Sequence, residues 1–317
     1  MITQCVCVLL DRAPSISEIA KVLSGYELLG EAPPAEGEHG WAFGGSSLTL
    51  TYRSEVNGRA CIDVIDSSWP DEMGSPDREP TIFAAWSMGH FGPTTYPGAL
   101  ARAVTHHLGP AELSAVVPRH RAVLRVRTSY VFGAGKDAPI LPAHYDAIHE
   151  LRFASEIQLR LASVPGVLVL FDPNAELLLA PERLASGLAR EGALPVDVWA
   201  GVRRLRPHDP AGWLLGDTLG MGQLDVVDQQ IVMPFDHPSA DNLGPLLCSI
   251  AAYDADLGGV VGPSDTASDA EGRGFTADWA GEALVGPPRP VLAWTPDDLE
   301  ALPEAFNAPP DPVGAPS

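Results

Sequence analysis

Lysine is almost absent from this sequence of 317 residues: Lys21 and Lys136 are the only two, and every other basic residue is arginine. Positive charge is scarce altogether, because 20 Lys and Arg stand against 41 Asp and Glu, which gives a net charge of −21. Nucleic-acid binding needs a basic surface that meets the phosphates, so this balance excludes a nucleic-acid partner. The preference for arginine, together with the many Ala, Gly and Pro residues, is typical of a GC-rich genome.

Long apolar runs are also missing. No stretch approaches the roughly 18 uninterrupted apolar residues that indicate a membrane-spanning helix. The apolar run at residues 5–10 has no positively charged segment before it and leads directly into Asp11 and Arg12, which does not fit an export signal. We therefore expect a soluble, cytoplasmic protein that makes no membrane contact.

The cysteines and histidines form none of the patterns that bind metals. Cys5, Cys7, Cys61 and Cys248 contain no CxxC pair and no repeated spacing, so neither a disulfide framework nor a zinc site is indicated. The nine histidines contain no HExxH motif. We expect no metal and no cofactor.

Hydrophobic residues make up 45% of the chain, which is enough to build a core. Ser15 and Glu18 match a capping box at a helix start, and Asn57-Gly58 between alternating apolar residues predicts a hairpin. The expected elements of the first part are a strand at 5–10, a helix at 15–25, and strands at 47–52 and 60–65.

Similar patterns recur in the second half of the chain. The expected elements there are strands at 120–131, 166–171, 176–179, 195–206, 212–219 and 231–235, with helices at 144–163, 181–190 and 241–257. Together they predict an α+β fold: two similar strand–helix–strand units that form antiparallel or mixed sheets, with helices packed on one face. The expected domains are 1–110, 119–265 and an acidic, Pro- and Gly-rich tail at 266–317 that is partly disordered.

The segment at 67–98 is expected to be an ordered loop, because aromatic residues are interleaved with small ones. Ser87, His90 and Asp71 could act there as nucleophile, base and orienting carboxylate. The sequence around Ser87 is not the Gly-x-Ser-x-Gly elbow of hydrolases, so the simpler hypothesis is a packed turn.

Arginines on one face of the strand at 120–131 are the most unusual local feature. Arg121, Arg125 and Arg127 share that face by the period-two rule of strands. In a chain this acidic they either pair with its own carboxylates or bind an anion.

The stretch from Trp213 to Ala267 resembles the bacterial domain-of-unknown-function family 4261. The resemblance rests on a Thr-x-Gly-Met segment at Thr218–Met221, the strand and long helix after it, and a turn around Asp265. That turn departs from the family's Gly-Asp-Thr-like pattern, because Pro263 and Ser264 precede the aspartate. The resemblance implies a bacterial cytoplasmic protein with an immunity-like role, but no catalytic residues, because the family has no established activity.

These observations lead to two functional hypotheses. The first is a non-enzymatic protein-interaction module with an acidic surface that suits a basic protein partner. The alternative is a small-ligand-binding protein or hydrolase that uses the loop around His90 and the arginine strand. Its ligand-binding candidates are Trp69, Trp86, Phe91, Arg121, Arg125, Arg127 and Asp217. The oligomeric state does not follow from the sequence.

Overall fold

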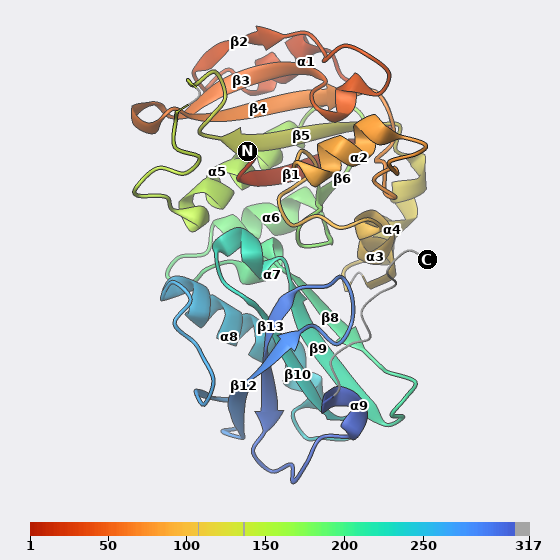
Figure 1. The fold of residues 1–317 in the computed structure, drawn as a ribbon, viewed down its shortest axis with the longest axis vertical. Helices are drawn as coiled ribbons and strands as arrows, with labels where there is room; N and C mark the ends of the chain where they lie inside the picture. Colours follow the sequence, from red (N-terminus) through yellow and green to blue (C-terminus); the bar gives the residue numbers. More distant parts are fainter. Residues whose placement is uncertain (107, 136, 308–317) are drawn as a thin grey trace. The chain divides into compact units, whose positions relative to one another are not determined.

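The computed structural model describes residues 1–106, 108–135 and 137–307, and the chain divides into two compact units, Met1–Glu191 and Gly192–Ser317. Each unit is built around one sheet with helices against it, so the α+β prediction is confirmed (Figure 1). Among the described helices, none combines the length and the apolar sequence that crossing a bilayer requires.

The first unit contains a seven-stranded sheet in the order β2-β3-β4-β5-β1-β6-β7, in which all neighbouring strands are antiparallel. Its strands are β1 (Gln4–Leu10), β2 (Leu28–Ala32), β3 (Ser46–Arg53), β4 (Gly58–Ile65), β5 (Ala122–Ser129), β6 (Val167–Asp172) and β7 (Leu177–Leu179). Its helices are α1 (Ile16–Val22), α2 (Pro80–Ser87), α3 (Ala99–His106), α4 (Ala111–Val116), α5 (Ala147–Leu161) and α6 (Pro181–Leu188).

The core of the first unit lies on both faces of β1. All seven residues of β1 are buried, as its continuous apolar run predicts. Cys5, Cys7 and Leu9 face a cluster that includes residues of α2 and α3, whereas α5 lies behind the sheet in Figure 1. The first sheet thus carries helices on both faces, one layer more than the sequence pattern indicated.

Local signals placed several boundaries correctly. The capping box is present, since Ser15 accepts from the Glu18 amide at 3.3 Å and its own amide donates to the Glu18 carboxylate at 2.8 Å. The hairpin between β3 and β4 is also confirmed, with Asn57 in the left-handed region at φ 59°. The expected loop at 67–98 instead contains α2, whose first residue is Pro80.

The second unit contains a six-stranded sheet in the order β11-β12-β13-β10-β9-β8, and only β10 and β13 run parallel among its described pairs. Its strands are β8 (Gly201–Leu205), β9 (Trp213–Leu219), β10 (Asp228–Pro234), β11 (Thr266–Ser268), β12 (Gly274–Glu282) and β13 (Pro290–Pro296). Its helices are α7 (Val196–Trp199), α8 (Leu243–Asp256) and α9 (Glu304–Asn307), and α8 lies against β8, β9 and β10.

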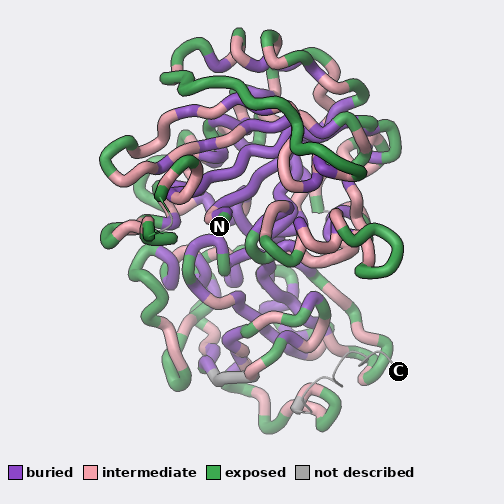
Figure 2. The backbone as a smooth tube through the Cα atoms, turned by 45° about the horizontal axis from the view of Figure 1, so that its top comes forward, coloured by how far each residue is buried: buried purple, intermediate pink, exposed green. Residues whose placement is uncertain are grey.

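The expected domain boundaries differ from these units. β5 opens the expected domain 119–265, yet it pairs with β4 on one side and β1 on the other, so the division falls after Glu191. The expected tail, 266–317, supplies three strands of the second sheet, and its final residues, 308–317, lie outside the described residues. The acidic, Pro-rich composition of this segment predicted disorder, although some of its apolar residues are part of the core. Figure 2 shows such buried residues in purple.

Phe275 tests whether the expected tail is part of the fold. Phe275 of β12 is fully buried, so Phe275→Ala should lower the free energy of unfolding by about 3–5 kcal/mol. The matched control is Phe235→Ala, because Phe235 is 40% exposed and its loss should cost about 1 kcal/mol or less. Urea denaturation followed by circular dichroism measures both, and equal small losses would show that β12 is not part of the core.

Candidate functional site

Two of the three arginines predicted on one strand face meet at a single carboxylate. Arg125 and Arg127 leave β5 on the same face, and the antiparallel register places Asp63 of β4 directly opposite Arg125. Nη2 of Arg125 lies 2.6 Å from Asp63 Oδ2, and Nη2 of Arg127 lies 3.2 Å from Asp63 Oδ1. All three side chains are at most 3% exposed, so two cations share one anion in the interior of the first unit.

Arg125 uses all five of its N–H groups. Two of them donate to Asp63, at 3.3 and 2.6 Å. The other three donate to the main-chain carbonyls of Trp41, Ala42 and His90, at 2.8–3.1 Å. The guanidinium therefore ties two irregular segments to β5, a task that suits its planar arrangement of donors.

Gly45 completes the surroundings of Asp63. Its amide donates to Asp63 Oδ2 at 2.9 Å, and a Cβ at this position would lie 1.8 Å from the carbonyl oxygen of Val64, so the close approach requires glycine. Burial acts to raise the pKa of Asp63, but Arg125, Arg127 and the hydrogen bonds outweigh it and hold the pKa below its usual value. Asp63 is therefore the ionised centre of the cluster.

His90 is half-buried beside the second arginine. Nη1 of Arg127 lies 2.8 Å from His90 Nδ1 and donates to the carbonyl of Phe43 at 2.9 Å. Burial, Arg127 and Arg125 lower the pKa of His90 to about 4, so the ring is neutral at pH 7. Its Nδ1 also lies 3.0 Å from the carbonyl oxygen of Phe43. Nε of Arg127 has no hydrogen-bond partner among the described residues, which leaves the cluster one unfilled donor.

The three residues considered for hydrolysis bond to separate partners. The Ser87 hydroxyl donates to the carbonyl of Phe83, one turn earlier in α2, at 2.9 Å. The Asp71 carboxylate accepts from two main-chain amides of α3, at 2.7 and 2.9 Å. His90 is engaged with Arg127, so the described contacts do not link nucleophile, base and carboxylate.

The aromatic candidates pack against one another. The ring of Trp69 lies 5.4 Å from Phe91 and 5.2 Å from Phe171, nearly perpendicular to both. Arg125 lies over the Phe91 ring at 5.0 Å, and the indole N–H of Trp86 donates to a main-chain carbonyl at 2.7 Å. Trp69 and Phe91 are buried, so these two rings belong to the core instead of lining an open pocket.

The remaining two candidates bond to groups outside the Asp63 cluster. Arg121 is exposed just before β5 and donates to the carbonyl of His120 at 2.9 Å. Asp217 lies in β9 of the second unit, where Nη2 of Arg203 and Nη2 of Arg289 lie 2.5 and 2.6 Å from its carboxylate.

The Asp217 cluster repeats the arrangement around Asp63 with balanced charge. Nε of Arg289 lies 3.1 Å from Asp228 Oδ2, so two arginines face two carboxylates. Both guanidiniums also donate to main-chain carbonyls of residues 285–287, at 2.7–3.2 Å. Burial raises the pKa of Asp228, although Arg289 opposes it. As in the first unit, buried arginines hold an irregular segment against the sheet.

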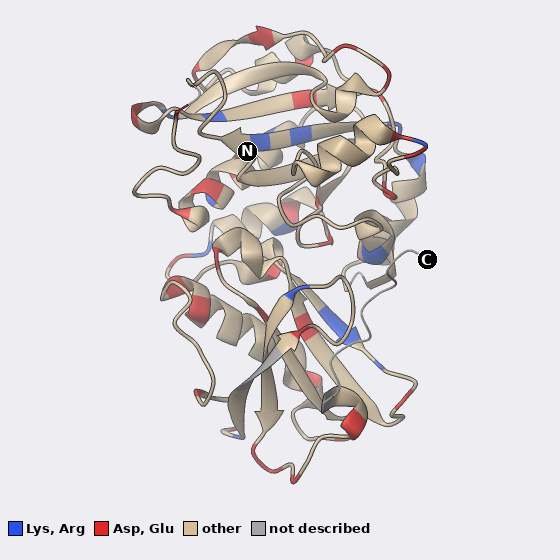
Figure 3. Cartoon of the chain, viewed as in Figure 1, with Lys and Arg blue, Asp and Glu red and all other residues tan. Residues whose placement is uncertain are grey.

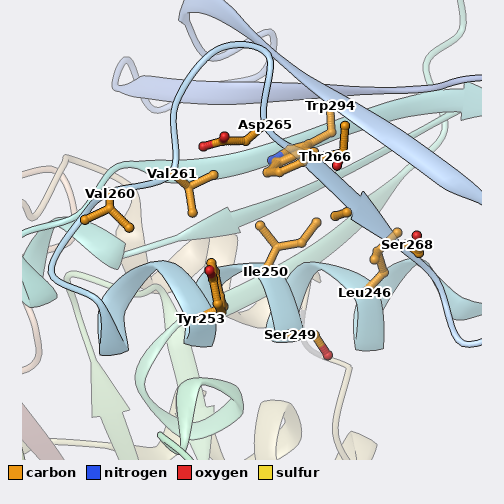
Figure 4. Close-up of a pocket in the computed structure, with 11 residues that line it drawn as sticks. Leu246, Ser249, Ile250, Tyr253, Val260, Val261, Asp265, Thr266, Ser268 and Trp294 are labelled. Carbon is orange, nitrogen blue, oxygen red and sulfur yellow. The ribbon is translucent and has the colours of Figure 1, made fainter.

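The second unit also contains an open groove of about 570 Å³ between α8 and the strands β11 and β13 (Figure 4). Leu246, Ile250 and Tyr253 form its α8 side, and Trp294 lies opposite Ile250. Asp265 is the one charged residue in the described part of its lining. An apolar groove with one carboxylate suits an apolar chain that carries positive charge.

Sequence reasoning missed this groove. Leu246, Ile250 and Tyr253 recur at helical spacing, and that stripe was the available signal. The sequence predicted the helix at 241–257 without assigning its faces. In the structure Leu246 and Ile250 are buried, whereas Tyr253 is 62% exposed. The opposite wall could not be anticipated, because it comes from the expected tail.

Within the described residues, no group of three or more His, Cys, Asp and Glu side chains is placed to hold a metal ion. Comparison with known proteins returned no matching family model, no similar curated protein and no similar solved structure. The resemblance to family 4261 therefore stays a prediction.

Asp63→Asn tests the buried cluster. Loss of the carboxylate charge leaves two buried guanidiniums uncompensated, so the free energy of unfolding should fall by about 3–5 kcal/mol. Asp66→Asn is the matched control: Asp66 is exposed three residues later, and its substitution should change stability by about 0.5 kcal/mol or less. Equal effects in urea denaturation would contradict the role of Asp63.

The lowered pKa of His90 predicts a pH dependence. Between the unfolded value of about 6.5 and the folded value of about 4, the unfolded chain binds the extra proton, so stability falls as pH falls through this window. His90→Gln should flatten the decline, whereas His208→Gln, at an exposed position, should retain it. Urea denaturation midpoints measured between pH 7 and pH 4 check this. A decline of the midpoint with falling pH that is as steep in His90→Gln as in the wild type would contradict the role of His90.

Proposed function

We propose that the chain is a non-enzymatic protein-interaction module whose acidic surface binds a basic segment of a partner protein. The observation that carries this proposal is the way in which the fold sorts its charges. Several arginines are buried and paired with buried carboxylates, and many further carboxylates are exposed.

The interior cations are arginines bound to carboxylates and carbonyls. Arg125, Arg127, Arg203 and Arg289 have side chains that are at most 8% exposed. Figure 3 shows the blue arginines of β5 beside a red segment of β4. Their carboxylate partners are buried with them, so these pairs contribute little to the field that an approaching partner meets.

The exposed carboxylates gather in both units. In the first unit they flank the edge strand β2, whose five residues are all exposed, and they are Glu27, Glu31, Glu36 and Glu38. In the second unit they lie on and near α8 and β11, and they are Asp241, Asp256, Asp265 and Glu271. Like-charged surfaces of this kind attract a basic partner and speed its association.

The alternative, a ligand-binding protein or hydrolase at His90, has less support. The groups that it needs bond elsewhere, as the contacts of Ser87 and Asp71 show. An interaction role requires none of these groups to be reactive. The cytoplasmic location and the immunity-like role implied by the family resemblance belong to the same proposal.

Salt dependence tests this function. The immobilised chain is exposed to a bacterial lysate at about 0.1 M salt and washed at about 1 M, where the Debye length falls from about 10 Å to about 3 Å. We expect elution of a basic protein, which after purification binds the chain again with saturation. Absence of such a protein, or binding that salt leaves unchanged, would contradict the proposal.

Two matched variants locate the binding face. One neutralises the second-unit group through Asp241→Asn, Asp256→Asn, Asp265→Asn and Glu271→Gln. The other neutralises the first-unit group through Glu27→Gln, Glu31→Gln, Glu36→Gln and Glu38→Gln. Both remove the same charge, so a loss of affinity in only one identifies the face, and unchanged affinity in both would also contradict the proposal.

A further inference from the structure

The strand β11 has a free edge. It is the outermost strand of the second sheet and pairs with β12 on one side. Ala277 donates its amide to the Asp265 carbonyl at 2.8 Å, and Asp269 donates its amide to the Arg273 carbonyl at 3.0 Å. The carbonyl of Asp265 and the amide of Asp269 therefore point toward β12, while the Asp265 amide donates to the carbonyl of Gly262 at 3.2 Å.

The intervening alternate residues turn the other way. In an antiparallel pair, successive residues direct their N–H and C=O groups to opposite sides. Thr266 and Ser268 therefore present theirs away from β12, both residues are exposed, and no partner for these groups occurs among the described residues. An open edge of this kind is a template for a further strand.

The groove described above runs beside this edge, since Thr266, Ala267 and Ser268 line it together with α8. Tyr253 and Val260 at the groove are 62% and 60% exposed, so solvent reaches apolar surface there. A strand added to β11 would place alternate side chains over these residues.

The negative charge at the groove favours a positively charged ligand. Asp265 is exposed and has no cationic partner among the described residues, while its Oδ2 accepts from the Gly262 amide at 2.9 Å. Among the described residues that line the groove there is no Lys or Arg. An added strand that carries lysine or arginine beside apolar residues would match both features.

We propose that an extended basic segment of a partner protein binds by adding as a strand to the free edge of β11, with apolar side chains in the groove against α8 and a cationic side chain at Asp265. This inference rests on the proposed function and specifies its site and partner chemistry. Main-chain hydrogen bonds to Thr266 and Ser268 supply affinity, and the groove supplies selectivity.

The test uses the full chain and a fluorescent octapeptide of alternating lysine and valine, followed by anisotropy. We expect saturable binding that weakens about tenfold or more when alternate peptide amides are N-methylated, because the donors to β11 are lost. Ser268→Pro should weaken it similarly, since it removes an outward N–H that the fold does not use. An alternating glutamate–valine peptide should not bind.

Further variants keep the test decisive. Tyr253→Ala leaves the strand ladder untouched and should weaken binding severalfold. Leu29→Ala, at an exposed apolar position of the edge strand of the other unit, should not. Circular dichroism checks that each variant is folded.

The outcomes separate this inference from the proposed function. Binding that tolerates N-methylation and Ser268→Pro but disappears at high salt would overturn strand addition and leave the acidic-surface function standing. No binding of the lysine–valine peptide would overturn the inference. The capture of a basic protein from the lysate tests the proposed function independently of this peptide. A dimer in sedimentation that Ser268→Pro dissociates would also overturn it, because a second copy would then occupy the edge.

Discussion

Compensation of buried guanidinium groups is the constraint on which both units depend. A buried charge is tolerated only when an opposite charge and hydrogen bonds replace water. Asp63 does this for Arg125 and Arg127, and Asp217 does it with Asp228 for Arg203 and Arg289. In each unit the same guanidiniums then hold an irregular segment through its carbonyls, so one pairing stabilises both a sheet and the chain that crosses it.

The need to pair buried cations also favours arginine over lysine at these positions, apart from any effect of genome composition. Arg125 donates five hydrogen bonds from one planar group. The ammonium group of lysine offers only three donors, all on one nitrogen. These arginines are buried together with carboxylates, so the acidic surface reflects the excess of Asp and Glu in the sequence.

Features that depend on near neighbours could be predicted from the sequence. The burial of β1, the capping box of α1 and the β3–β4 hairpin each arise from a few adjacent residues. The shared face of Arg125 and Arg127 followed from strand periodicity, but Asp63 did not, because its position depends on the register between β4 and β5, about sixty residues apart. The groove was hidden for the same reason, since one wall is α8 and the other comes from the expected tail.

Amide hydrogen exchange tests the central claim most directly, because it reports on the main-chain groups that the open edge presents. If a basic strand adds to β11, the lysine–valine peptide should slow exchange at Thr266 and Ser268, the two outward-facing amides, and leave β2 unchanged. Slower exchange confined to β2 or to the segment around His90, or no change at Thr266 and Ser268 under saturating peptide, would contradict the claim.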